Sequence, residues 1–448
     1  MKRFDKNKYL KKIKIKRWLS NYSRYLYLGL SCILVCTLGV YLAYSKFFVS
    51  KEETVIKTTV GNFIQGDVVI GAYIDNEYSS SIPGKNDGYV VEKVVCDNGA
   101  TGEWDNDKWG LLTTNLTKRT KCNVYFKKVV SKVPDIIATV DTTGKCPTVN
   151  ADGSVSVTAV EATNGYLCKA KDAYGDSYYY RGNVTNNYVK FADKYWRIVR
   201  INGDGTVRVI YDGTSAHANG ESSSDRQIGE SVFNDDYEDN AYVGYMYGAA
   251  GASTYAEAHA NTNDSTIKTY IDNWYKTNIL GTANEQYLAD NIFCNDRSIS
   301  NDNIGTGARM TSTHYRWYWG PWESGNHNDN MKLVCPQQND AFMVSDTTKG
   351  NGALTYQVGL LSTDEIVLAG GWNTSNSGYY LYSGQDWWAS SPFNFDGSYA
   401  GVHYVYSNGS ANYGSSVDIA SGVRPVFNLK AEVLKNGDGT MNNPYRLV

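Results

Sequence analysis

The chain has 448 residues, of which 20% are charged and 13% are aromatic, and its formal net charge is −3. Ten of its basic residues lie in the first 24 positions, so 33 basic residues face 45 acidic ones in the rest of the chain. An acidic body does not suit a nucleic acid or an anionic lipid surface as its partner. The length exceeds one ordinary core and predicts two or more domains.

The N-terminal segment predicts a basic cytoplasmic tail over residues 1–24 and a transmembrane anchor over residues 25–48. Tyr25 to Ser45 is a run of 21 residues without a charge, enough to cross ~30 Å of hydrocarbon at ~1.5 Å per residue. The basic tail should stay inside the cell, which predicts a single-pass protein of the cell membrane whose C-terminal domain is extracellular. The alternatives are a cleaved signal peptide and a buried core helix.

The remainder is rich in Tyr, Asn, Gly and Ser and holds only 8 Pro in all. Because turn formers are common and helix formers scarce, we expect short strands joined by many loops. The predicted fold class is α+β: the transmembrane helix, then a small disulfide-tied β-domain at 51–130, a linker at 131–145 and a mixed α+β domain of short antiparallel strands at 146–448.

Eight cysteines divide into two groups. Cys32 and Cys36 fall within the predicted anchor, and the other six lie in the part expected outside the cell, where disulfides form. Pairing of sequence neighbours closes modest loops, and a metal site finds no CxxC or CxxxH spacing to support it. The predicted disulfides are Cys96–Cys122, Cys146–Cys168 and Cys294–Cys335.

The clearest local structure is a hairpin over residues 188–213, with alternating apolar residues around the turn sequence NGDGT. A calcium loop or a phosphate loop is the alternative interpretation of that turn. Helices are predicted at 264–278, where the apolar stripe has helical spacing, and at 284–292. A third, shorter helix is indicated at 361–370, because Ser362 and Glu365 have capping-box spacing and Gly370 can end the helix.

Residues 372–429 form the most distinctive stretch. Twelve aromatic residues lie between Trp372 and Tyr413, and no Lys or Arg occurs from Trp372 to Val423. Ser407 to Ser410 predicts a hairpin turn, and Gly422 to Leu429 a final strand. The expectation is an aromatic, weakly acidic surface, with at least half of the rings buried in the core.

Several segments of residues 145–448 together resemble a family of uncharacterised, membrane-anchored surface proteins of Gram-positive-type bacteria. They include YYYRGNVTNNYVKFADKYWRIVRINGDGTVRVIYDG, DSTIKTYIDNWYKTN, GLLSTDEIVLAGG, WWASSPF and SGVRPVFNL. The helix, the WWASSP segment and the terminal GVRPVFNL are also similar to the C-type-lectin-like fold, which the formylglycine-generating enzymes share. In those enzymes paired cysteines near the C-terminal end do the chemistry. This chain has no cysteine after Cys335, so the resemblance implies a lectin-like binding domain.

No catalytic motif is found: the sequence lacks GxSxG, HExxH and a phosphate loop. We therefore predict no enzyme activity, no catalytic residue, no cofactor and no metal. His314 and His327 flank a Trp-rich loop, where a metal pair is the alternative to ordinary packing.

The predicted function is that of a membrane-anchored, adhesin-like protein that binds a glycan, a peptide or another protein. Rings would stack on sugar faces, and amide or carboxylate groups would fix hydroxyls. The alternatives are a structural cell-envelope protein without a specific ligand and an exported hydrolase of glycans or cell wall, which would use paired carboxylates. The candidate binding residues are Trp387, Trp388, Asn394, Asp396, Tyr399, His403, Tyr404 and Tyr406.

Overall fold

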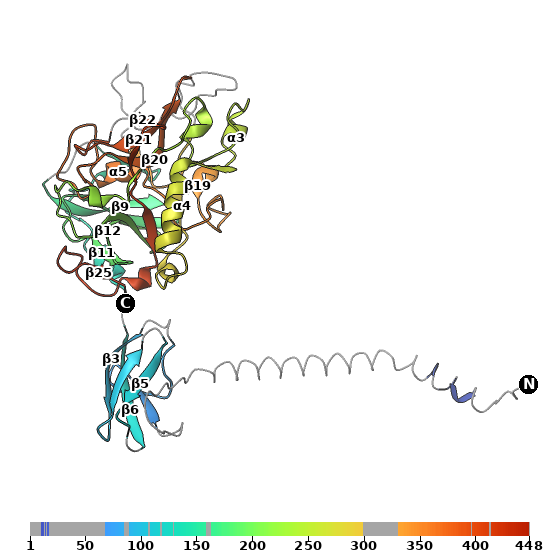
Figure 1. Cartoon of the computed structure of the whole chain (residues 1–448), viewed down its shortest axis with the longest axis vertical. Helices are drawn as coiled ribbons and strands as arrows, with labels where there is room; N and C mark the ends of the chain where they lie inside the picture. Colours follow the sequence, from blue (N-terminus) through green and yellow to red (C-terminus); the bar gives the residue numbers. More distant parts are fainter. Residues whose placement is uncertain are drawn as a thin grey trace, which may run out of the picture. The chain divides into compact units, whose positions relative to one another are not determined.

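The computed structural model divides into two compact units, residues 1–128 and 129–448 (Figure 1). The residues that the structure describes run from 68 to 447, apart from 85–88, 106–107, 117–118, 129, 158–162, 299–329, 396 and 412–413, together with residues 10–12, 14, 16 and 17.

The first unit is a four-stranded sheet with a separate hairpin. The strand order is β2-β1-β6-β3, and β1 and β6 run parallel. Its core contains Leu111, Val124 and Phe126, and the Cys96–Cys122 disulfide joins neighbouring strands β3 and β6. The strands are β1 (Val68–Ile74), β2 (Glu77–Ser79), β3 (Tyr89–Cys96), β4 (Thr101–Asp105), β5 (Gly110–Thr114) and β6 (Thr120–Lys128).

The second unit is built on a seven-stranded sheet with the path β24-β13-β12-β10-β9, to which β11 and β25 are attached. The predicted hairpin is β12 followed by β13, and the turn closes through a hydrogen bond from the Asn202 amide to the Thr206 carbonyl. The strands are β9 (Gly165–Asp172), β10 (Gly175–Gly182), β11 (Tyr188–Phe191), β12 (Lys194–Ile201), β13 (Val207–Gly213), β24 (Val426–Leu429) and β25 (Tyr445–Arg446).

A second sheet of five strands has the order β14-β23-β20-β21-β22. Its strands are β14 (Glu230–Ser231), β20 (Trp387–Phe395), β21 (Ala400–Val405), β22 (Gly414–Ser416) and β23 (Ser421–Gly422). Three smaller sheets complete the unit. They consist of β7 (Thr148–Val149), β8 (Val155–Ser156) and β18 (Asn330–Met331); β15 (Met246–Tyr247) and β16 (Asn263–Asp264); and β17 (Phe293–Cys294) and β19 (Ala341–Phe342).

Helices are few and short in the described residues, so the predicted α+β class is corrected to a mostly β fold. The α-helices are α2 (Val133–Ile137), α3 (Tyr255–Ala258), α4 (Thr266–Asn278) and α5 (Thr363–Ala369). The 3-10 turns are η1 (Ser224–Arg226), η2 (Asn240–Val243), η3 (Glu285–Tyr287), η5 (Gln338–Asp340) and η6 (Ala431–Val433). The helix expected at 284–292 is reduced to η3, where the chain continues in an extended conformation from Leu288.

The two other predicted helices are present. Helix α4 begins at Thr266, two residues later than expected, because Ser265 accepts the capping hydrogen bond from the Lys268 amide. Helix α5 has the predicted capping box between Ser362 and Glu365, and Gly370 ends it with a positive φ of 122°. The residues expected to form a linker, 131–145, include α2, which belongs to the second unit and contributes Val133 and Ile136 to its core.

The described part of the chain contains no helix that is long and apolar enough to cross a membrane. Its longest α-helix, α4, has 13 residues, whereas a span needs about 20. This finding contradicts the predicted anchor, the membrane as a partner and the single-pass localisation with an extracellular domain. Residues 25–48 themselves, and most of the predicted basic tail at 1–24, lie outside the described residues.

The structure contains the three disulfides that neighbour pairing predicted: Cys96–Cys122, Cys146–Cys168 and Cys294–Cys335. They close loops with sequence separations of 26, 22 and 41 residues. By constraining the unfolded chain, each can contribute ~2–4 kcal/mol to stability.

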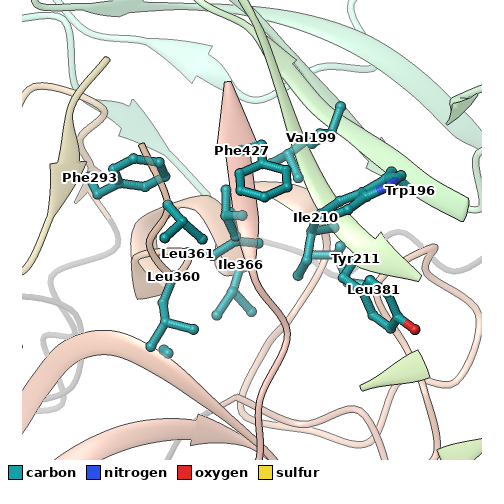
Figure 2. Close-up of a cluster of buried hydrophobic side chains, with 14 of the residues drawn as sticks. Trp196, Val199, Ile210, Tyr211, Phe293, Leu360, Leu361, Ile366, Leu381 and Phe427 are labelled. Atoms are coloured by element: carbon teal, nitrogen blue, oxygen red, sulfur yellow. The ribbon is translucent and has the colours of Figure 1, made fainter. Parts of the chain in front are cut away.

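One hydrophobic core extends through the second unit from α2 to β25. Figure 2 shows part of it, in which Phe427 of β24 lies near Trp196 of β12, with ring centroids 4.8 Å apart. Ile366 of α5 and Leu361 pack in the same cluster. The core therefore joins the central sheet to the segment before and within α5.

A buried charge cluster at the end of β13 adds a polar constraint to this core. The Asp212 carboxylate lies 2.7 Å from the guanidinium of Arg226 and 2.9 Å from that of Arg424, and Arg197 approaches it at 3.8 Å. All four side chains are fully buried. Three cations share one anion, and backbone carbonyls of residues such as Val184, Tyr380 and Leu381 accept the remaining guanidinium hydrogen bonds.

Removal of the Asp212 charge should be strongly destabilising. Asp212→Asn leaves three buried arginines without their counter-charge, and we expect a loss of about 3–5 kcal/mol in unfolding free energy by chemical denaturation of the full chain. Asp193→Asn, in the exposed turn before β12, is the matched control and should be nearly neutral. Equal stabilities of the two variants would contradict a structural role for Asp212.

Candidate functional site

Trp387 and Trp388 lie in the core and not on a surface. Trp387 packs against the buried guanidinium of Arg424, 4.9 Å from the ring centroid. The Trp388 indole nitrogen donates a hydrogen bond of 2.9 Å to the Ser231 carbonyl, and its ring meets Phe233 edge-on. Both tryptophans are therefore corrected from ligand-binding to packing residues.

The other predicted binding residues are not brought together as one exposed platform. Asn394 and His403 are buried, and the His403 ring lies edge-on to Phe393. Tyr404 and Tyr406 are half-buried, with ring centroids 4.4 Å apart. Tyr399 is exposed, whereas Asp396 lies outside the described residues.

A different concavity, which we call the tyrosine–aspartate groove, lies beside strands β20 and β21. It has a volume of about 470 Å³. It is lined by Ser231, Asn234, Asp235, Asp236, Tyr242, Tyr247, Asp264, Thr266, Thr269, Tyr270 and Asn273.

One wall of the groove is a face of helix α4. Thr266, Thr269, Tyr270 and Asn273 recur at helical spacing and line the groove. The opposite stripe of the same helix, which includes Ile267 and Ile271, is buried in the core. The amphipathic pattern thus fixes which polar side chains the helix presents to the groove.

The facing wall is the segment that runs from β14 through η2 to β15. The Asn234 side chain ties it to α4, since its amide nitrogen donates to the Tyr242 carbonyl at 2.8 Å and its oxygen accepts from the Thr266 amide at 3.3 Å. Asp239 caps η2 by accepting from the Ala241 amide at 2.8 Å. These side-chain bonds give an irregular segment a defined position against the helix.

Three half-buried tyrosines give the groove its aromatic surface. The rings of Tyr242 and Tyr247 meet edge to face, with centroids 5.4 Å apart. Burial, together with the charge of Asp236 and a hydrogen bond to it, raises the pKa of Tyr242 to about 12. The Tyr270 hydroxyl donates to the Ile228 carbonyl at 3.4 Å, close against Gly229, where a Cβ would collide with that hydroxyl.

The charge of the groove is negative. Asp235, Asp236 and Asp264 are exposed and line it. Lys268 lies buried behind the groove, where its ammonium pairs with Asp264 at 3.1 Å and with Asp272 at 2.8 Å. Burial outweighs the pairing with Lys268 and raises the pKa of Asp272. No Lys or Arg occurs among the described residues that line the groove.

Strands β20 and β21 form hydrogen bonds with the segment that lines the groove. Ser231, which lines it, accepts the hydrogen bond from Trp388, and the Ala400 amide donates to the Tyr237 carbonyl at 2.8 Å. Tyr237 and Tyr399 are each 38% exposed. The Asp- and Tyr-rich sequence FNDDYEDNAYVGYMYG (233–248) is the signal that could have pointed to this site.

A cluster around His217 has a superficial likeness to a catalytic triad. The ring nitrogens of His217 lie 2.8 Å from Glu221 and 3.0 Å from Asp225, and the Ser215 hydroxyl is 3.4 Å from Nε2. The Asp225 carboxylate contacts Nε2 of His217 and also accepts hydrogen bonds from the amides of Thr214 and Ser215. The cluster therefore holds together the loop between Thr214 and Asp225. It leaves no free base for a nucleophile.

Among the residues that the structure describes, no group of three or more His, Cys, Asp or Glu side chains is arranged to hold a metal ion. His314 and His327, with the Trp-rich loop between them, lie outside those residues.

Comparison with known proteins gives one finding. Residues 329–431 match a domain of unknown function (DUF6273). Neither the curated proteins nor the solved structures contain a match to the chain, so the resemblance to the lectin-like fold stays a prediction. The matched segment includes β20, β21 and Arg424, whereas the residues that line the groove precede it.

Trp388→Ala should lower the stability of the folded protein, because the side chain packs in the core. Loss of a fully buried indole costs ~3–5 kcal/mol, so thermal denaturation should show a clearly lowered melting temperature. An unchanged melting temperature would contradict the packing role and return Trp388 to the list of exposed candidates.

Asp225 should make the His217 loop sensitive to acid. Burial raises the pKa of Asp225, but hydrogen bonds from His217 and Thr214 outweigh it and lower the pKa to about 2. Since the folded pKa lies below the ordinary aspartate value of 3.8, the stabilisation is present above about pH 4 and is lost as the pH falls through about 2. The difference in unfolding free energy between the native chain and Asp225→Asn should therefore shrink from pH 6 to pH 2. A difference independent of pH would contradict this assignment.

Proposed function

We propose that the second unit is a saccharide-binding module and that its ligand occupies the tyrosine–aspartate groove. The observation that carries the proposal is the combination, in one concavity, of three half-buried tyrosines with exposed carboxylate, amide and hydroxyl groups. This composition is typical of sites that place the apolar face of a sugar against a ring and bind its hydroxyls with polar side chains.

The dimensions of the groove suit a small ligand or one end of a longer chain. Its volume of about 470 Å³ falls within the range of roughly 300–1,000 Å³ that small-molecule sites occupy. The hydroxyls of Thr266 and Thr269 and the amide of Asn273 lie along one helical face, so they offer a row of donors and acceptors.

The carboxylates of the groove make a glycan hydrolase the second candidate function. Asp235, Asp236 and Asp264 line one concavity, and glycoside hydrolysis needs two carboxyl groups at a defined separation. Product analysis separates the two functions: a binding module returns the saccharide intact, whereas a hydrolase releases shorter chains.

The proposal is tested by a glycan array with the full chain, followed by titration of any hit by calorimetry. Tyr242→Ala should weaken binding about fivefold or more, because an aromatic contact at the centre of a site contributes more than about 1 kcal/mol. Asp236→Asn is the second variant, since an exposed side chain can be changed without a loss of folding. Tyr399→Ala, at an exposed tyrosine outside the groove, is the matched control and should bind as the native chain does.

Two results would contradict the proposal. If Tyr399→Ala abolishes binding while Tyr242→Ala and Asp236→Asn keep it, the ligand lies at the connection between β20 and β21. If the array gives no hit with folded protein, a structural protein without a specific saccharide ligand is the better description.

A further inference from the structure

We propose that the tyrosine–aspartate groove selects saccharides that carry a free, protonated amino group. This inference rests on the proposed saccharide-binding function and goes beyond it by naming the ligand class.

The described lining of the groove presents three acidic side chains and no basic one. Each carboxylate only accepts hydrogen bonds, and an ammonium group has three donors and no acceptor. A sugar hydroxyl donates one hydrogen bond to such a carboxylate, whereas a protonated amine also carries a positive charge and forms an ion pair with it.

Lys268 does not cancel this charge. Its ammonium is buried and forms ion pairs with Asp264 and Asp272, and not with Asp235 or Asp236. Asp235 and Asp236 therefore remain as exposed acids without an ion pair to a described lysine or arginine. The amide of Glu238 donates to Asp236 at 3.1 Å, and this hydrogen bond orients the carboxylate without neutralising it.

The tyrosines favour the same ligand. A cation over the face of a tyrosine ring is attracted by the ring quadrupole, and the attraction is stronger where the ring is partly shielded from water. Tyr242, Tyr247 and Tyr270 are half-buried, so an amine within the groove would meet both carboxylates and ring faces. Sugars that bear carboxylate, sulfate or phosphate groups would be repelled by the same acids, which adds a negative element to the specificity.

The direct test compares oligomers of glucosamine with oligomers of N-acetylglucosamine of the same length, titrated against the full chain. The two probes differ in charge at one nitrogen per sugar. We expect the glucosamine oligomer to bind at least tenfold more tightly at pH 6, and the preference to fall as added salt screens the exposed carboxylates.

Variants assign the preference to the groove. Asp236→Asn and Asp235→Asn should each reduce the ratio of the two affinities several-fold, whereas Asp193→Asn, which removes a carboxylate outside the groove, should leave it unchanged. Asp236→Asn retains an acceptor for the Glu238 amide, and its melting temperature reports whether the fold is kept.

The outcomes separate this inference from the proposed function. Equal affinities for the two oligomers, or tighter binding of the acetylated one, would overturn amine selection and leave saccharide binding in place. Binding of neither oligomer nor of any array saccharide would overturn both. Tight binding of a lysine oligomer with no binding of glucosamine oligomers would overturn the amino-sugar assignment in favour of a basic peptide.

Discussion

The second unit depends on the burial of one aspartate among three arginines. Asp212 at the end of β13 pairs with Arg226 and Arg424 and draws in Arg197. Such an arrangement is stable only if the excess positive charge is solvated by the protein, and here backbone carbonyls of distant segments accept the remaining guanidinium hydrogen bonds. Burial lowers the pKa of Arg424 to about 9 despite the counter-charge of Asp212.

This cluster also positions the candidate site. Arg424 is preceded by Val423, which pairs with the residues just before β14: the Ile228 amide donates to the Val423 carbonyl, and the Val423 amide donates to the Gly229 carbonyl, each at 2.9 Å. Gly229 in turn leaves room for the Tyr270 hydroxyl. A chain of contacts therefore leads from the buried charges to Tyr270, one of the three groove tyrosines. The charge cluster that stabilises the fold also positions part of the candidate site.

Local features of the structure could be predicted from the sequence, whereas exposure could not. Cysteine spacing predicted all three disulfides, and Ser362 and Glu365 predicted the start of α5, because loop closure and capping depend on nearby residues. The alternating pattern of 387–406 does not say which face is covered, and every residue of β20 is buried. Trp387 and Trp388 therefore belong to the core. The groove joins residues of five short segments between 231 and 273, which only the tertiary structure brings together.

The central claim is that ligand contact takes place in the groove and not on the aromatic strands. Hydrogen–deuterium exchange of the full chain, with and without a saturating glucosamine oligomer, tests it by location. We expect slowed exchange in peptides that cover residues 231–247 and 264–273, with little change across 397–407. Protection confined to 397–407, with the groove segments unaffected, would contradict the account.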